Sequence, residues 1–122
     1  MSNTYDDPLR VSYQLNAASL ATAAELATYV GPAGKQGRVE SISALVTTAV
    51  TVAPSVVTVN DLANTVVGGS LSVPIGAVDT FANAITGNTD ATLLPADSPF
   101  TIDTNGGATA GAANLVVVVA WF

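Results

Sequence analysis

Alternating apolar and polar residues run through much of the chain and predict short β-strands. Residues 9–15 alternate strictly, so the odd-numbered positions share one strand face. Residues 27–30 read as another strand, and residues 37–46 as the clearest one, with a change of face near Ser41 that predicts a β-bulge. Residues 16–27 are ambiguous, because Leu20, Ala23, Ala24 and Ala27 fit a helical stripe and Ala favours helix.

β-Branched residues carry the strand pattern through the second half of the chain. The predicted strands there cover 47–52, 55–59, 66–75, 99–103 and 113–122. The unbroken apolar run from Leu115 to Val119 predicts a central strand buried on both faces. Residues 76–98 are rich in turn formers and are expected to be a long connection that makes contacts.

Short strands separated by regular turn signals define the expected fold class. The sequence predicts an all-β protein, an antiparallel β-sandwich or jelly-roll-like barrel. Residues 9–122 are expected to form the single domain, because 122 residues suit one core. Residues 1–8 are polar and end in a proline, and we expect a flexible N-terminal arm there.

The residues that are missing exclude most enzyme chemistry. The chain has no His and no Cys, and its only basic residues are Arg10, Lys35 and Arg38. It therefore has no imidazole to move protons and no thiolate nucleophile, so we expect no enzyme, no catalytic residue, no metal site and no cofactor. A net charge of −6 also argues against nucleic acid and anionic membranes as partners.

Two acidic motifs are candidate cation sites. Asp103 begins a segment with Asn105 and two glycines that resembles the start of a calcium loop, but no acidic residue follows it. Turn chemistry favours a hairpin turn there instead. The adjacent Asp6 and Asp7 are expected to belong to the solvated arm.

Aromatic residues are the best candidates for contacts with other proteins. Hydrophobic residues make up 49% of the chain and charged residues 10%, which indicates a surface that partners cover. Trp121 and Phe122 either anchor a subunit contact or close the end of the core. Tyr5, Asp6 and Asp7 in the arm and Phe81 in the long connection complete the predicted contact residues.

The order of these segments resembles a family of virion proteins. The similarity covers most of the chain from Val11 onward, including residues 27–46, the Gly-Gly-Ser-Leu-Ser-Val-Pro stretch, residues 94–110 and the Val-rich last strand. In this order the chain resembles the head decoration, or cement, proteins of tailed bacteriophages. The family pattern of Gly-Asp before the penultimate strand is replaced here by Ala96 to Pro99.

The resemblance implies a structural function. A protein of this family binds major capsid protein on the outside of the capsid, often as a homotrimer, and reinforces the shell by bridging neighbouring subunits. The N-terminal sequence lacks a basic region and an apolar core, so we expect synthesis in the host cytoplasm and a final location on the virion.

A binding module is the alternative hypothesis. A carbohydrate- or receptor-binding β-domain of a phage fibre or cell surface would need exposed aromatic rings with polar neighbours. The chain has seven aromatic residues, and Phe81 is the best candidate among them.

Overall fold

The computed structural model describes residues 9–62, 66–85 and 93–122. The predicted arm at residues 1–8 lies outside the described residues. The described residues form eight antiparallel β-strands and no helix, so residues 16–27 resolve as strand and turn. The strands are β1 Leu9–Ser19, β2 Ala24–Val30, β3 Gly37–Thr51, β4 Ser55–Asp61, β5 Val66–Val73, β6 Phe81–Ile85, β7 Pro99–Thr104 and β8 Ala110–Trp121.

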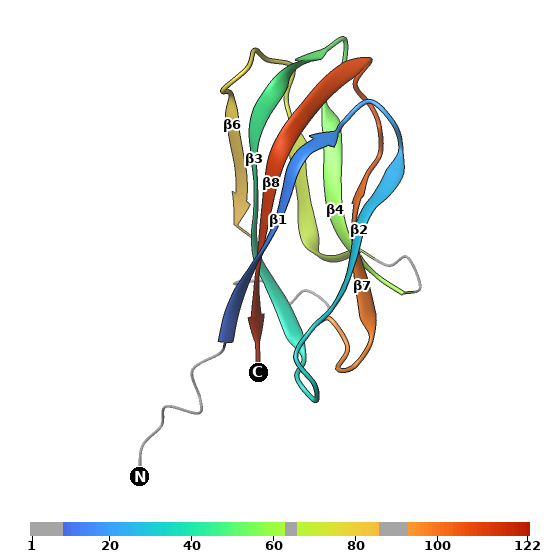
Figure 1. The fold of residues 1–122 in the computed structure, drawn as a ribbon, viewed down its shortest axis with the longest axis vertical. Coiled ribbons are helices and arrows are strands. Elements are labelled where there is room, and N and C mark those ends of the chain that lie inside the picture. The colour runs from blue at the N-terminus through green and yellow to red at the C-terminus, as the bar shows by residue number, and fades with distance from the viewer. Residues whose placement is uncertain (1–8, 63–65, 86–92) are drawn as a thin grey trace.

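Two four-stranded sheets pack face to face as a β-sandwich (Figure 1). One sheet has the order β1-β8-β3-β6 and the other β2-β7-β4-β5. Strand pairs β1–β8, β2–β7, β3–β6 and β4–β5 nest inside one another, as in a long hairpin folded in half and rolled up. Pairings of β3 with β8 and of β4 with β7 complete the sheets. This connectivity is that of a jelly roll, so the predicted fold class is confirmed, as a sandwich of two open sheets.

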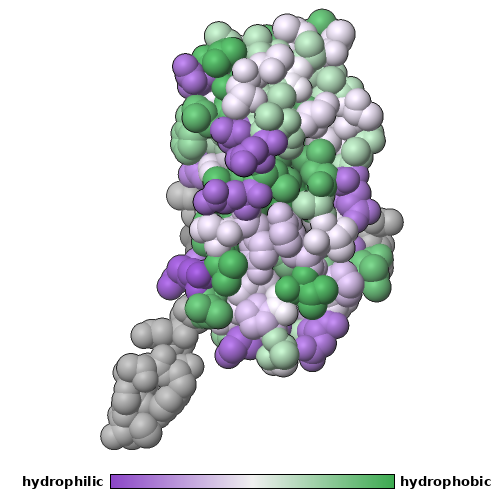
Figure 2. Space-filling model, viewed as in Figure 1, coloured by the Kyte–Doolittle hydropathy of each residue, from purple (hydrophilic) through white to green (hydrophobic). Residues whose placement is uncertain are grey.

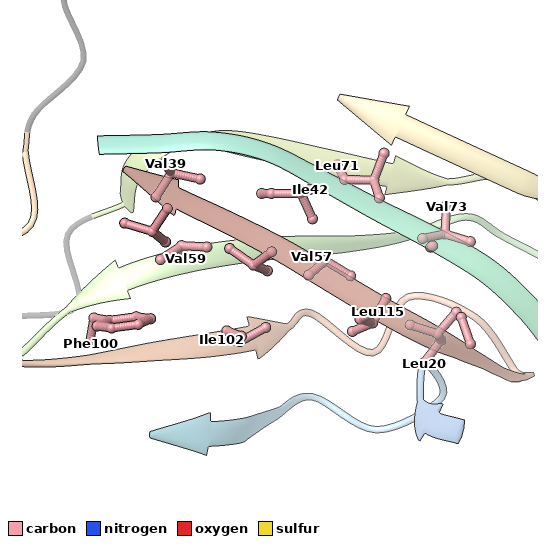
Figure 3. Close-up of a cluster of buried hydrophobic side chains, with 14 of the residues drawn as sticks. Leu20, Val39, Ile42, Val57, Val59, Leu71, Val73, Phe100, Ile102 and Leu115 are labelled. Atoms are coloured by element: carbon pink, nitrogen blue, oxygen red, sulfur yellow. The ribbon is translucent and has the colours of Figure 1, made fainter. Parts of the chain in front are cut away.

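The core lies between the sheets, where side chains from both inner faces meet (Figure 3). Ile42 and Leu115 from the first sheet face Val57 and Ile102 from the second, and all four are fully buried. Alternate residues of each strand supply this layer, as period-two patterning requires. Twelve of the buried residues are Val, Leu, Ile or aromatic residues on β3, β4, β7 and β8, namely Val39, Ile42, Val46, Val50, Val57, Val59, Phe100, Ile102, Leu115, Val117, Val119 and Trp121, with Leu71 of β5 beside them.

The predicted bulge in the third strand is confirmed. The register between β3 and β8 shifts between Val39 and Ser41, so Glu40 is the extra residue. Both Val39 and Ile42 therefore face the core, although they are three positions apart. A bulge of this kind adds one residue to a strand, so the alternation of side chains between the two faces shifts by one position while the strand stays paired.

The last strand is central but only one of its faces is buried, which corrects the prediction. β8 lies between β1 and β3. Val117 and Val119 face the core and are fully buried, whereas Val116 and Val118 lie on the outer face and are half-buried. The valines of the outer face pack beside neighbouring strands, and nothing in the described part of the chain covers them from above.

The segment from Asn105 to Gly107 is not a hairpin turn, because β7 and β8 belong to different sheets. It connects the sheets instead. The Asn105 Oδ1 atom accepts hydrogen bonds from the backbone N–H of Val56 at 2.9 Å and of Gly107 at 3.0 Å. Gly106 has a φ of 64°. A Cβ atom there would lie 2.1 Å from the Ala23 backbone nitrogen, so only glycine fits.

Residues 76–98, expected to be one long connection, contain a strand. β6 forms the outer edge of the first sheet by pairing with β3. Asn83 interrupts an otherwise apolar five-residue strand, and the turn formers on both sides concealed it in the sequence.

Candidate interaction surface

Exposed hydrophobic side chains gather along the β6 edge of the first sheet. Leu45 of β3 lies directly opposite Phe81 of β6, and both point to the outer face. Phe81 is 65% exposed and Leu45 is 39% exposed. Ile75 and Val78, in the connection between β5 and β6, and Val52, at the end of β3, are also exposed. We call these five residues, Leu45, Val52, Ile75, Val78 and Phe81, the β3–β6 strip.

Backbone hydrogen bonds hold the strip together. The β5–β6 connection runs beside the end of β3. Backbone hydrogen bonds join Val46 to both Thr80 and Asp79, and two more join Val50 to Gly76. The strip is therefore a continuation of the sheet edge rather than an independent loop. Because β6 is short and has no strand outside it, its apolar side chains remain accessible.

The rest of the outer face of this sheet is mixed. Ser12, Val118 and Ser41 form one row across the strands, and Gln14, Val116 and Ser43 form the next. Figure 2 shows hydrophobic residues interspersed with hydrophilic ones over the viewed face. Scattered apolar residues of this kind are normal on protein surfaces.

An ion pair crosses the last strand on the same face. Arg10 on β1 and Glu40 on β3 make two contacts, Nε to Oε1 at 2.7 Å and Nη2 to Oε2 at 3.2 Å. The pair lies at the surface, where such interactions stabilise a fold by only about 0–1 kcal/mol.

The outer face of the second sheet is polar. Thr28, Thr101 and Asn60 form one row, and Glu25, Asp103 and Thr58 form the next. Thr101 Oγ1 and one carboxylate oxygen of Asp103 are buried without a hydrogen-bond partner in the described structure. Bound water ordinarily satisfies such atoms.

The acidic motif at Asp103 does not gather into a metal centre with other described residues. Glu25 and Asp103 lie directly opposite each other, but the described residues contain no group of three or more potential metal ligands. The outer face of β2 and β7 therefore offers two carboxylates and hydroxyl groups rather than a coordination shell. Asp6 and Asp7 lie outside the described residues.

Trp121 belongs to the core rather than to an exposed contact. It is 1% exposed, and its ring lies 5.8 Å from that of Phe100. Tyr13 and Tyr29 complete an aromatic cluster in which Tyr13 packs against Tyr29 at 4.7 Å and Phe100 at 5.2 Å. Of the two interpretations of the terminal aromatic pair, the structure therefore supports closure of the core for Trp121.

Two glycines make room for the indole ring. A Cβ atom at Gly31 would lie 2.2 Å from a Trp121 ring atom, and one at Gly37 would lie 2.7 Å from the ring. The ring therefore rests directly on the backbone around the β2–β3 connection. Trp121 Nε1 donates a hydrogen bond to the Tyr13 hydroxyl at 3.1 Å, which satisfies its only polar group.

Phe122 is exposed, so the expectation of a buried aromatic end holds only for Trp121. Phe122 is 47% exposed, and the Arg38 guanidinium lies 5.3 Å from its ring centroid. This geometry allows a cation–π contact, which contributes about 0.5–1 kcal/mol at an exposed site. Among the other predicted contact residues, Phe81 is exposed at the sheet edge and Tyr5 lies outside the described residues.

The sequence interpretation missed four residues of the strip. Leu45, Val52 and Ile75 fall within predicted strands and Val78 within the expected long connection, and nothing in the sequence shows which positions lie at a sheet edge. Leu45 did carry a signal, since it falls between the core positions Ala44 and Val46 and so must point outward.

We expect the stability of the domain to decline at alkaline pH partly through Tyr13. Burial raises the pKa of the Tyr13 hydroxyl, the hydrogen bond from Trp121 lowers it, and Tyr29 raises it further. A raised pKa in the folded state gives stability that is complete below the unfolded value of about 10 and is lost as the pH rises through the folded value. Urea denaturation at a series of pH values should show that the unfolding free energy falls less steeply with rising pH in Tyr13→Phe than in the wild type. An equally steep fall in both proteins would contradict a contribution from Tyr13.

The described residues form a jelly-roll sandwich with exposed apolar side chains along its β3–β6 edge. None of the described residues forms a helix long and apolar enough to cross a membrane.

Comparison with known proteins identifies the fold but no family. No protein-family model matches the chain, and no curated protein matches it in sequence. The chain is similar to a solved structure reported as "Bacillus endospore appendages form a novel family of disulfide-linked pili", with a TM-score of 0.50 and 14% identity. The match covers 94% of this chain and 88% of that one. At this identity it shows a shared fold, and the resemblance to phage decoration proteins stays a prediction.

Proposed function

We propose that this chain is a structural protein that binds the outer surface of a phage capsid. It would bridge neighbouring major capsid protein subunits and thereby stabilise the shell. The observation that carries a contact function is the β3–β6 strip, five exposed apolar residues at one edge of the sandwich. Exposed apolar areas of this kind mark protein interaction sites. The capsid as partner comes from the sequence resemblance.

The same proposal includes self-association and a location on the capsid exterior. A chain with 49% hydrophobic and 10% charged residues gains from covering apolar surface with further copies. A homotrimer is the form that the resemblance implies, and cyclic symmetry is the usual way in which identical subunits close an assembly. No cofactor, nucleic acid or membrane is part of the proposed function.

A subunit of a surface appendage is the second candidate. It is favoured by the similarity to the endospore appendage structure, a pilus protein of the same fold. That pilus family is disulfide-linked, and this chain has no cysteine, so any polymer of it would rely on non-covalent contacts. Both candidates are structural proteins that act through subunit contacts.

Co-sedimentation with capsids tests the first candidate against the second. The purified chain is mixed with capsids that lack it, and the pellet is assayed for saturable binding. Saturation at a fixed ratio to major capsid protein, with higher thermal stability of the capsid, is the expected result. Filaments of the chain alone in electron micrographs, with no capsid binding, would support the appendage subunit and reject the capsid proposal.

Removal of residues 1–8 should weaken capsid binding while the domain stays folded. Tyr5 is the expected anchor, and loss of an aromatic anchor at an interface commonly costs about 2 kcal/mol, or roughly 30-fold in affinity. Unfolding curves should be unchanged, because the core lies within residues 9–122. Capsid binding of the truncated chain at the original affinity would show that the arm has no part in the contact.

A further inference from the structure

The β3–β6 strip is nearly free of charge. Asp79, which is exposed between Val78 and Thr80, is the one charged residue within or next to the strip among the described residues. Its carboxylate makes no hydrogen bond or ion pair in the part of the chain that the structure describes. The surface therefore combines apolar contact area with a single unpaired negative charge.

Two of the four non-glycine residues with a positive φ in the described part of the chain lie in or next to the strip. Val52 has a φ of 74° and Asp79 a φ of 72°. This left-handed region is unfavourable for a β-branched residue by about 1–2 kcal/mol. Val52 is 74% exposed, so packing within the subunit does not offset the cost. Strained residues of this kind cluster at functional sites, which is consistent with a contact outside the subunit.

The opposite end of the molecule carries the complementary features. Figure 1 shows the β5–β6 connection at one end of the long axis and the β2–β3 connection at the other. At the second end, exposed apolar residues and cations surround the end of β8. We call Leu9, Val30, Lys35, Arg38 and Phe122 the C-terminal end surface. Leu9 pairs with Trp121, and Gln36 pairs with Phe122 through two backbone hydrogen bonds.

Two cations of this surface have no acidic partner. Lys35 and Arg38 are exposed and form no ion pair within the described residues, whereas Arg10 is paired with Glu40. Arg38 contacts the Phe122 ring, so cation and apolar surface are adjacent. Asp97 accepts a hydrogen bond from the Gly34 backbone N–H, next to Lys35 in the chain, at 2.8 Å.

We propose that the β3–β6 strip of one copy docks on the C-terminal end surface of a second copy. In this contact Asp79 would face Lys35 and Arg38, and Phe81 and Val52 would pack against the apolar residues of the partner copy. The inference rests on the proposed structural function and names the contact through which copies associate. Such a contact joins two different surfaces, so repeating it produces either a closed ring or a filament.

Charge argues against pairing of the strip with itself. A two-fold contact between two strips would bring two Asp79 carboxylates together with no cation in the strip to offset them. Opposed like charges disfavour an interface, and opposite charges fix its orientation. The only described cations lie around the other end, which selects the pairing of unlike surfaces.

Charge reversal in one surface at a time tests this contact. Asp79→Arg gives the strip a positive charge, and Arg38→Asp gives the end surface a negative one. Sedimentation velocity at low salt should show each variant alone to associate at least ~10-fold more weakly than the wild type. An equimolar mixture should regain association, because each variant then supplies the surface that complements the other. High salt should weaken the wild-type contact as well.

Two further variants separate association from folding. Val52→Asn suits the left-handed backbone, so it should keep or raise the unfolding free energy while association weakens. Phe81→Ser should weaken association more strongly, by about 30-fold, as expected for an aromatic anchor. Glu25→Lys and Leu62→Ser are the matched controls, since both residues are exposed and lie outside the two surfaces. Both controls should associate like the wild type.

The outcomes distinguish this contact from the proposed function. Wild-type chain that sediments as a single copy at every concentration overturns the contact, as does a mixture of the two charge variants that stays as weak as each alone. If Phe81→Ser associates normally, the strip is not the interface. Capsid binding by the wild type in any of these cases leaves the proposed function standing, and loss of capsid binding with intact self-association rejects only that function.

Discussion

Replacement of Val117 by Asp should unfold the domain. Val117 is fully buried in the middle of the central strand, between Tyr13 on β1 and Ile42 on β3. An uncompensated carboxylate at such a position costs about 3–5 kcal/mol, and the lost valine packing adds to this. Domains of this size are stable by about 5–15 kcal/mol, so most of the folded population should disappear. Circular dichroism and a denaturant titration measure the effect.

The neighbouring Val118→Asp variant is the matched control. Val118 lies on the outer face between Ser12 and Ser41 and is half-buried. The same chemical change one residue away should leave a cooperatively folding protein, with a loss of about 1 kcal/mol. A folded Val117→Asp protein would contradict the burial of Val117. If Val118→Asp is unfolded at the same time, the register of β8 is off by one residue.

Truncation of Trp121 to Ala should lower the unfolding free energy by about 3–5 kcal/mol. The indole ring is buried against Phe100 and lies directly on the backbones of Gly31 and Gly37. Its removal leaves a large cavity and deprives the Tyr13 hydroxyl of its hydrogen-bond donor. Urea denaturation measures the change. Phe122→Ala should cost less than about 1 kcal/mol, because the side chain is half-exposed.

Enlargement of Gly31 provides a reciprocal test of the same packing. Gly31→Ala alone should be destabilising by about 1–3 kcal/mol, because the new methyl group overlaps the indole ring. In a protein that already carries Trp121→Ala, the methyl group enters the cavity, so the double variant should lose less than the sum of the single losses. Simple additivity would show that the ring does not lie on Gly31.

The strand pattern was largely predictable because it depends on local chemistry. Alternation and β-branched runs indicated seven of the strands, and the face change near Ser41 indicated the bulge at Glu40. The missed strand, β6, is five residues long and has Asn83 at its centre. It forms because β3 supplies hydrogen-bond partners along it, and such partners are invisible in a single local window.

The candidate surface was only partly predictable. Phe81 was identified from its type, yet its importance comes from Leu45 opposite it and from the edge position of β6. Trp121 and Phe122 are neighbours in sequence with the same aromatic character, but the pleat turns one into the core and the other outward. Residue type alone does not separate an anchor of the core from an anchor of an interface.

Residue type and short-range periodicity were enough to predict the all-β class, the approximate strands, the central position of the last strand and the lack of imidazole and thiol chemistry. Three features came only from the folded structure: the strands pair as a rolled hairpin, Asn105 to Gly107 connects two sheets, and the β5–β6 connection is bonded along the end of β3. These features depend on contacts between residues far apart in the chain. Burial between the sheets and pairing between the strands stabilise such contacts, and a short stretch of sequence does not encode either.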